Sequence, residues 1–218
     1  QDTNQWKTNT GEVIHLPRLE YRLHVSEFRM PPLKRGFWDQ NPPKLPYTRF
    51  PQWLFCPSCK KLIKWKAIME EKGKIPKCKN DSCYGSKTLT PMRFVIACNE
   101  GHLGDVDWWW WAHSNNQAAE GGNCGLDDYK DPGKTSNLEF RSVQRAGGGL
   151  QSIEISCTCG ARRSLAGIAA KDSMKGVGLK CPGKQPWQFI DYESDTNSGC
   201  KSIPQVLQRG ATNLYYPS

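Results

Sequence analysis

The chain has little apolar sequence. Hydrophobic residues make up 37% of its 218 residues, and the mean hydropathy is -0.68. The longest apolar run is too short to cross a bilayer, and the polar segment from Gln1 to Pro17 has no apolar stretch typical of a signal peptide. We therefore expect a cytoplasmic protein with no membrane partner, in which the cysteines stay reduced and available to metal.

Signatures of several enzyme classes are also missing. The chain has no Walker loop, no glycine-rich dinucleotide fingerprint and no Cys/His pair at a spacing typical of nucleophilic catalysis. These absences argue against an ATP-driven motor and against a small-molecule substrate. Long regular helices are not expected either, because 20 glycines and 15 prolines interrupt the chain.

Cysteine, in contrast, is abundant, and four of the ten cysteines form two close pairs. Cys56 and Cys59 flank a Pro-Ser turn, and Cys78 and Cys83 follow after an 18-residue interval. This spacing is typical of one tetrahedral zinc, whereas disulfide pairing is the alternative. Four thiolates leave no coordination position for water, so we predict a structural Zn²⁺ site.

A second cysteine group lies near the end of the chain. We predict that Cys157, Cys159, Cys181 and Cys200 hold a second ion. Because spacing alone does not decide ligand partners, Cys98, His102 and Cys124 remain competing ligands. Several of these cysteines can instead be buried thiols of the core. The expected cofactor is therefore zinc, with one or two ions per chain.

Histidines and carboxylates surround a run of four tryptophans. His102, Asp105 and His113 form an alternative site, that of a metal-dependent nuclease or hydrolase, because such sites combine His, carboxylate and an open position. The adjacent Trp108–Trp111 run indicates burial instead, and no second cluster supplies an acid or base. We therefore predict a protein that is not an enzyme and has no catalytic residues.

The tryptophan run itself cannot face one ligand. Consecutive side chains point in different directions on a helix and on a strand, so most of Trp108–Trp111 is expected in a core or an interface. Stacking on nucleic-acid bases and anchoring of a protein partner remain alternatives for an exposed indole.

The local patterns predict an α+β fold of small, irregular, zinc-stabilised domains, with zinc-ribbon-like strands and knuckles and short helices. Strands are expected at 53–55, 62–65, 92–97, 138–142 and 150–156, and helices at 164–171 and, capped by Asp105 or Asp107, through the tryptophans. Residues 16–23 suit a strand or a helix turn. Four regions are expected: an extended Pro/aromatic-rich arm (1–52), a first zinc-ribbon-like unit (53–100), a Trp-rich segment and loop (101–149) and a second Cys-rich unit (150–218).

The net charge of +9 is unevenly distributed. Lys and Arg exceed Asp and Glu in residues 1–100 and 141–218, whereas acidic residues dominate 101–140. Two basic regions suit an anionic polymer, although an ordinary solvated basic surface is the alternative. The candidate phosphate contacts are Lys60, Lys61, Lys64, Lys66, Arg141, Arg145, Arg162 and Arg163.

Four segments together carry a family resemblance: Phe50–Cys59, Arg93–Asp105, Cys159–Gly167 and Gln208–Asn213. In these segments the chain resembles the N-terminal part of the DrmB family of the bacterial DISARM anti-phage system, and the similarity spans most of residues 50–217. Proteins of that family are much longer, and this chain begins with Gln1 instead of Met, so we expect it to be part of a longer protein.

The resemblance implies a partner and a role. DrmB-like proteins partner a large helicase, DrmA, which supplies ATP hydrolysis, and the pair engages DNA as a defence against phage. The resemblance assigns no catalytic residue. The resulting prediction is a non-enzymatic, zinc-binding accessory subunit that helps a DrmA-like helicase engage DNA. A purely structural interaction scaffold without nucleic-acid contact is a further alternative.

Overall fold

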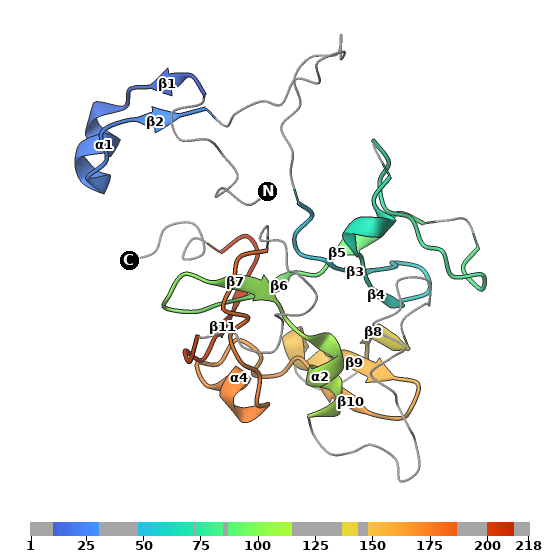
Figure 1. Ribbon diagram of the computed structural model, residues 1–218. Coiled ribbons are helices and arrows are strands. Elements are labelled where there is room, and N and C mark those ends of the chain that lie inside the picture. Colours follow the sequence, from blue (N-terminus) through green and yellow to red (C-terminus); the bar gives the residue numbers. More distant parts are fainter. Residues whose placement is uncertain are drawn as a thin grey trace. The chain divides into compact units, whose positions relative to one another are not determined.

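A computed structural model describes residues 11–30, 48–71, 73–84, 87–114, 137–143, 148–186 and 200–211 (Figure 1). The chain divides into two compact units, one of Gln1–Thr48 with Trp187–Tyr192 and one of Arg49–Pro186 with Glu193–Ser218. Within the described ranges, every helix is too short or too polar to cross a membrane.

The described part of the first unit is a small hairpin-like fold. Strands β1 (Val13–Ile14) and β2 (Phe28–Arg29) pair antiparallel, and helix α1 (Pro17–Leu23) connects them. Proline suits the first helical turn because its φ is fixed and its missing N–H is not needed there. For residues 16–23 a strand and a helix turn were the two alternatives, and the structure has helix α1 there. This helix lies inside the region predicted as an extended arm.

Among the described residues of the second unit, the strands form three antiparallel sheets of three strands each. Their orders are β4-β3-β5, β11-β6-β7 and β10-β9-β8. The strands are β3 (Trp53–Phe55), β4 (Leu62–Lys64), β5 (Thr90–Pro91), β6 (Phe94–Ala97), β7 (Leu103–Asp105), β8 (Leu138–Ser142), β9 (Ile153–Cys157), β10 (Arg162–Ser164) and β11 (Gln205–Gln208).

The helices among the described residues of this unit are short. They are α2 (Trp108–His113), α4 (Ser173–Gly176) and the 3-10 turns η2 (Ala67–Met69) and η3 (Gly149–Ser152). The predicted α+β class, with small antiparallel sheets, short helices and cysteine clusters, is confirmed.

The helix predicted at 164–171 is wrong. Arg162–Ser164 is strand β10, turns follow, and α4 begins only at Ser173. Gly167 has a φ of 70°, a left-handed conformation that interrupts a right-handed helix. Leu165 and Ile168 are nevertheless fully buried, because a turn places both side chains on the core side.

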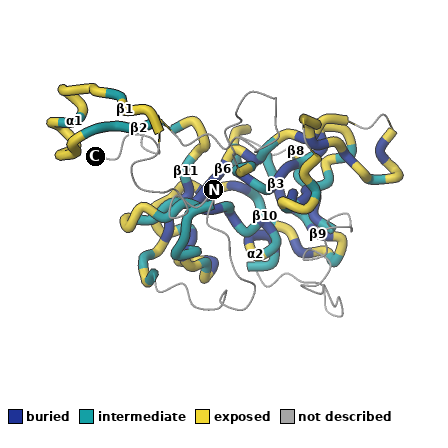
Figure 2. Tube along the Cα trace, turned by 45° about the horizontal axis from the view of Figure 1, so that its top comes forward, coloured by how far each residue is buried: buried dark blue, intermediate teal, exposed yellow. Residues whose placement is uncertain are grey.

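Strand β3 divides the apolar interior into two clusters. Trp53 and Phe55 face the larger core, whereas Leu54 and Cys56 face a smaller cluster that includes Cys78 and Cys83. Successive side chains of a strand point to opposite faces, so one short ribbon serves both clusters. Figure 2 shows that buried residues concentrate in the second unit, whereas β1, α1 and β2 carry only exposed and intermediate positions.

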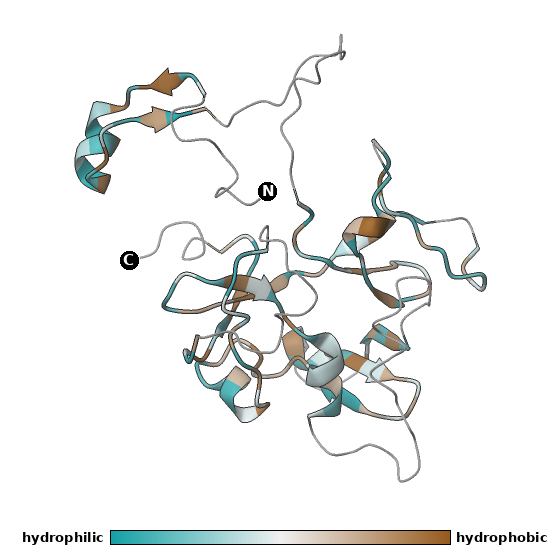
Figure 3. Cartoon of the chain, viewed as in Figure 1, coloured by the Kyte–Doolittle hydropathy of each residue, from teal (hydrophilic) through white to brown (hydrophobic). Residues whose placement is uncertain are grey.

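The tryptophan helix α2 packs against β9 and β10 (Figure 1). The carboxylate of Asp107 caps it by accepting the N–H of Trp110 at 2.9 Å. Trp108 and Trp111 are fully buried, and Trp110 is 43% exposed while its indole N–H donates to the carbonyl of Val177. Trp108 and Trp111 are thus core residues and Trp109 packs against the core, in agreement with the prediction of a core or an interface for most of the run. The helix is pale in Figure 3 because tryptophan has a near-neutral hydropathy index.

Candidate metal centres

The first cysteine group has the geometry of a tetrahedral site. The Sγ atoms of Cys56 and Cys83 lie 3.6 Å apart, and those of Cys59 and Cys78 lie 3.7 Å apart. All four sulfurs lie within 4.8 Å of one another. Zinc–sulfur bonds of about 2.3 Å give a tetrahedron edge of about 3.8 Å, whereas a disulfide bond measures about 2.05 Å. The spacing therefore fits one metal ion, and none of the described cysteines forms a disulfide.

Two tight loops position these sulfurs. Cys56 follows β3 directly, its N–H donates to the carbonyl of Lys61, and its own carbonyl accepts the N–H of Lys60. On the other side, the N–H of Cys83 donates to the carbonyl of Asn80, and the N–H of Cys78 donates to the carbonyl of Lys87. Backbone bonds thus fix both loops in a zinc-ribbon-like arrangement.

Within this group the thiols differ in acidity. Burial by itself raises the pKa of Cys59, but hydrogen bonds from the backbone of Lys61 and the side chain of Asn80 outweigh it and lower the pKa to about 7. Burial raises the pKa of Cys78 to about 12. The thiol of Cys59 therefore ionises near neutral pH, whereas that of Cys78 stays protonated. A bound cation would allow both to be thiolates at the same time.

A second group gathers Cys98, His102, Cys181 and Cys200, whose ligand atoms all lie within 4.8 Å of one another. The Sγ of Cys98 lies 3.4 Å from Nδ1 of His102 and 3.9 Å from the Sγ of Cys200. Cys98 and His102 occupy the turn between β6 and β7, Cys181 follows α4, and Cys200 precedes β11. Three sulfurs and one imidazole make a closed set of the Cys₃His type.

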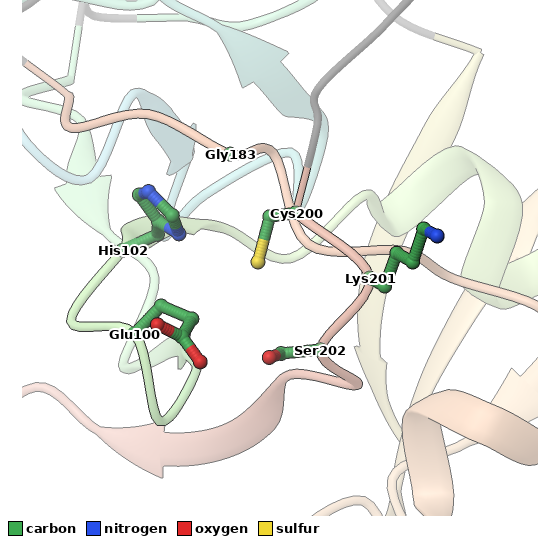
Figure 4. Close-up of a pocket in the computed structure, with 6 residues that line it drawn as sticks. All are labelled: Glu100, His102, Gly183, Cys200, Lys201 and Ser202. Carbon is green, nitrogen blue, oxygen red and sulfur yellow. The ribbon is translucent and has the colours of Figure 1, made fainter.

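An open pocket of about 580 Å³ gives solvent access to this second group (Figure 4). His102 and Cys200 line it together with Glu100, Gly183, Lys201 and Ser202. In Figure 4 the sulfur of Cys200 points inward on the same side as the hydroxyl of Ser202, whereas Lys201 points away. The backbone N–H of Ser202 is the main cause that lowers the pKa of Cys200 to about 7, and burial raises that of Cys181 to about 12.

The structure divides the four cysteines that we expected to form the second shell. Cys181 and Cys200 join Cys98 and His102, whereas Cys157 and Cys159 lie with His113 in a third group. The reason is topological: the β9–β10 hairpin faces α2, and the segments of Cys181 and Cys200 meet the β6–β7 turn. Cys98 and His102 were competing ligands in the sequence, while Cys124, the other competitor, lies outside the described residues.

The residues of the hydrolase alternative do not meet in one group. His102 and His113 belong to different cysteine groups. The carboxylate of Asp105 accepts the backbone N–H of Gln52 at 3.1 Å and that of Trp53 at 3.5 Å. This arrangement ties strands together and leaves the carboxylate without a place in either group.

Two comparisons with known proteins match almost the whole chain. A family model described as "Domain of unknown function (DUF8724)" matches residues 1–216. The chain belongs to this DUF8724 family. It is also similar to the DISARM protein DrmB of Bacillus paralicheniformis, at 29% identity over 223 residues that cover 100% of this chain and 34% of that protein. The chain thus spans about a third of this curated relative, and the resemblance to DrmB is confirmed.

In this DUF8724 chain, some of the candidate phosphate contacts come together at one edge. The N–H of Phe140 donates to the carbonyl of Lys60, which joins β8 to the end of the first knuckle. Glu139 pairs with Lys61 at 3.1 Å and also with Arg141. We call Lys60, Lys61 and Arg141 the β4–β8 basic edge.

The other basic candidates lie elsewhere. The guanidinium of Arg163 lies 4.1 Å from the centre of the Trp111 ring and donates to the hydroxyl of Ser114, so it is engaged within the fold. Arg162 is exposed, and Lys64 and Lys66 are half-buried. Arg145 lies outside the described residues.

Proposed function

We propose that this chain is the zinc-stabilised, non-enzymatic part of a DrmB-like accessory subunit, which helps a DrmA-like helicase engage DNA in an anti-phage defence complex of the bacterial cytoplasm. The observation that carries the proposal is the similarity to the DISARM protein DrmB along the whole of this chain. Because the chain spans about a third of that relative, the activity and partners of the whole protein belong to the proposal.

Zinc is the metal that suits these ligands. Thiolate with imidazole favours zinc over magnesium or calcium, which prefer oxygen. Both of the four-ligand groups are complete from protein side chains alone, so neither needs a water in its shell. Their role in the proposal is to hold loops from distant parts of the chain in one shape for a partner to recognise.

The DNA contribution is assigned to phosphate contacts. In the β4–β8 basic edge, Lys61 and Arg141 both pair with the carboxylate of Glu139, and the ammonium of Lys60 donates to the carbonyl of Pro57. Three cations against this one carboxylate leave a local excess of positive charge. Cations of this kind bind phosphates without reading base sequence. Such binding weakens steeply as the salt concentration rises, because the release of counterions from DNA is then less favourable.

The test is co-purification and DNA binding with a DrmA-like helicase. The helicase should co-purify with the full protein that contains this chain. Its complex should bind DNA at least about tenfold more weakly at about 200 mM salt than at about 50 mM. Cys56→Ser together with Cys59→Ser should remove the zinc of the first group and the helicase interaction, whereas Ser58→Ala, in the same turn, should change neither.

Two results contradict parts of this proposal. If the helicase binds the double cysteine variant as well as the natural protein, the zinc group does not shape the partner surface. If DNA binding by the helicase is the same with and without this subunit, the interaction-scaffold alternative holds and the DNA role is lost.

A further inference from the structure

The turn between β9 and β10 repeats the backbone of the two turns that already carry ligand pairs. In each hairpin a cysteine stands at the end of the first strand, and its N–H donates to the first residue after the turn. The three bonds are Cys56 to Lys61 at 3.0 Å, Cys98 to His102 at 3.1 Å and Cys157 to Ala161 at 2.7 Å. The β6–β7 and β9–β10 turns have the same length, and the Cys56 turn is one residue longer. In all three, a backbone bond across the turn fixes the first cysteine.

A second bond and a left-handed residue complete the match. The carbonyl of each leading cysteine accepts the N–H of the residue just before the return strand segment, and that residue has a positive φ. The three are Lys60 at 64°, Gly101 at 79° and Gly160 at 96°. A third hairpin of this form, with Cys157 and Cys159 in it, has the construction of a metal knuckle.

His113 is placed to be the third ligand beside these two cysteines. Its Nε2 lies 3.3 Å from the Sγ of Cys159, close to the nitrogen–sulfur edge of about 3.6 Å in a tetrahedral zinc site. Its Nδ1 lies 2.6 Å from the carbonyl oxygen of Trp109. That carbonyl can only accept, so Nδ1 carries the proton and the lone pair of Nε2 faces the sulfurs.

Packing holds this imidazole in place. The ring of Trp109 stacks on it with centroids 4.2 Å apart and planes inclined by 21°. Cys157 is buried, and the ligand atoms of His113, Cys157 and Cys159 all lie within 4.8 Å of one another. An orienting backbone bond on the far nitrogen is the usual support of a zinc-bound histidine.

We propose that His113, Cys157 and Cys159 bind a third zinc ion, which clamps the tryptophan helix α2 to the β9–β10 hairpin. This site goes beyond the proposed function, which uses two groups. Three ligands come from the described residues, and two thiolates with one imidazole suit zinc better than any oxygen-preferring cation. The competing interpretation is a pair of ordinary core thiols beside a hydrogen-bonded histidine.

The number of metal ions per chain distinguishes a third zinc site from a pair of core thiols. The purified 218-residue chain, loaded with zinc and dialysed, should contain three zinc ions by elemental mass spectrometry. His113→Ala and Cys159→Ser should each contain two. Thr158→Ala, in the same turn, and His15→Ala, a histidine of the first unit, should keep three. Two ions in the natural chain, or an unchanged count in both site variants, would overturn the proposal.

A second measurement uses the natural chain, so it does not depend on a variant that folds. Iodoacetamide labelling followed by peptide mass spectrometry should show Cys157 and Cys159 protected in the zinc-loaded chain and labelled after chelation. If these two thiols react at the same rate in both states while Cys56 and Cys59 are protected by zinc, there is no third site. Neither measurement involves DNA or a helicase, so its failure leaves the proposed function standing.

Discussion

At the scale of single residues, Asp105 shows how one buried carboxylate organises a sheet junction. The backbone N–H groups of Gln52 and Trp53 donate to it from the chain that enters β3. Burial raises its pKa from the ordinary 3.8 to about 6, although the bond from Gln52 and the nearby charge of Lys64 partly oppose the rise. The carboxyl therefore titrates close to neutral pH.

The raised pKa predicts a pH-dependent stability. A carboxyl whose pKa is higher in the folded than in the unfolded chain favours folding when protonated, and this contribution is lost as the pH rises through about 6. Relative to Asp105→Asn, the free energy of unfolding of the natural chain should fall by about 1 kcal/mol between about pH 5 and 7. Urea unfolding with zinc in excess measures it.

Comparison at each pH cancels the metal contribution, because both chains keep the same ligands. Asp107→Asn is the control, since asparagine also caps α2 and its stability should follow that of the natural chain at every pH. A difference between natural chain and Asp105→Asn that stays constant across this range would show that Asp105 does not titrate as described.

Sequence spacing predicts metal ligands that are close in the chain and misses those that are far apart. Cys56 with Cys59 and Cys78 with Cys83 lie in single loops, so their spacing already brings each pair together. Cys98 and Cys200 are 102 positions apart, and the Sγ contact between them depends on how β6 and β11 pair. Spacing carries no information about such a contact, which is why Cys181 and Cys200 were grouped with the wrong hairpin.

At the scale of elements, short strands are predictable where the local pattern is clear. Residues 138–142, expected as a strand, form β8. Residues 53–55, also expected as a strand, form β3, and the two apolar clusters lie on its two faces. The helix expected at 164–171 fails because one left-handed glycine outweighs a favourable apolar spacing.

The bridge between Lys61, just before β4, and Glu139 of β8 leads to a prediction that rests on the proposed DNA role. Although burial raises the pKa of Glu139, its bonds to Lys61 and Arg141 outweigh burial and lower the pKa, so the carboxylate is ionised at neutral pH. Glu139→Gln removes one negative charge from the β4–β8 basic edge. The complex should then bind DNA several-fold more tightly at low salt, with a salt slope steeper by about one ion.

Fluorescence anisotropy over a salt series measures both quantities. Glu27→Gln is the matched control, because Glu27 also pairs with an arginine, Arg29, but lies in the first unit. Lys61→Ala should act in the opposite direction and weaken binding. Equal affinities for Glu139→Gln and Glu27→Gln would mean that the gain comes from net charge alone and not from this edge.

At the scale of the whole chain, the second unit has two apolar clusters that depend on metal to different degrees. The smaller cluster contains Cys56, Cys78 and Cys83 among only a few apolar side chains, whereas the larger core is built around Trp53, Trp108 and Trp111. A cluster this small contributes little hydrophobic free energy, so the first metal group should supply most of its stability.

Loss of the first metal should therefore open one part of the second unit and spare the rest. In Cys83→Ser, the amides of Cys78 and Leu89, which donate to Lys87 and Pro76, should exchange with deuterium roughly tenfold faster or more. The amides of the β8–β9 ladder should keep their protection, because that ladder packs on the larger core. Ser82→Ala, beside the substituted ligand, should leave both regions unchanged. Equal loss of protection in both regions would show that the first metal holds the whole unit, and that the two clusters unfold as one.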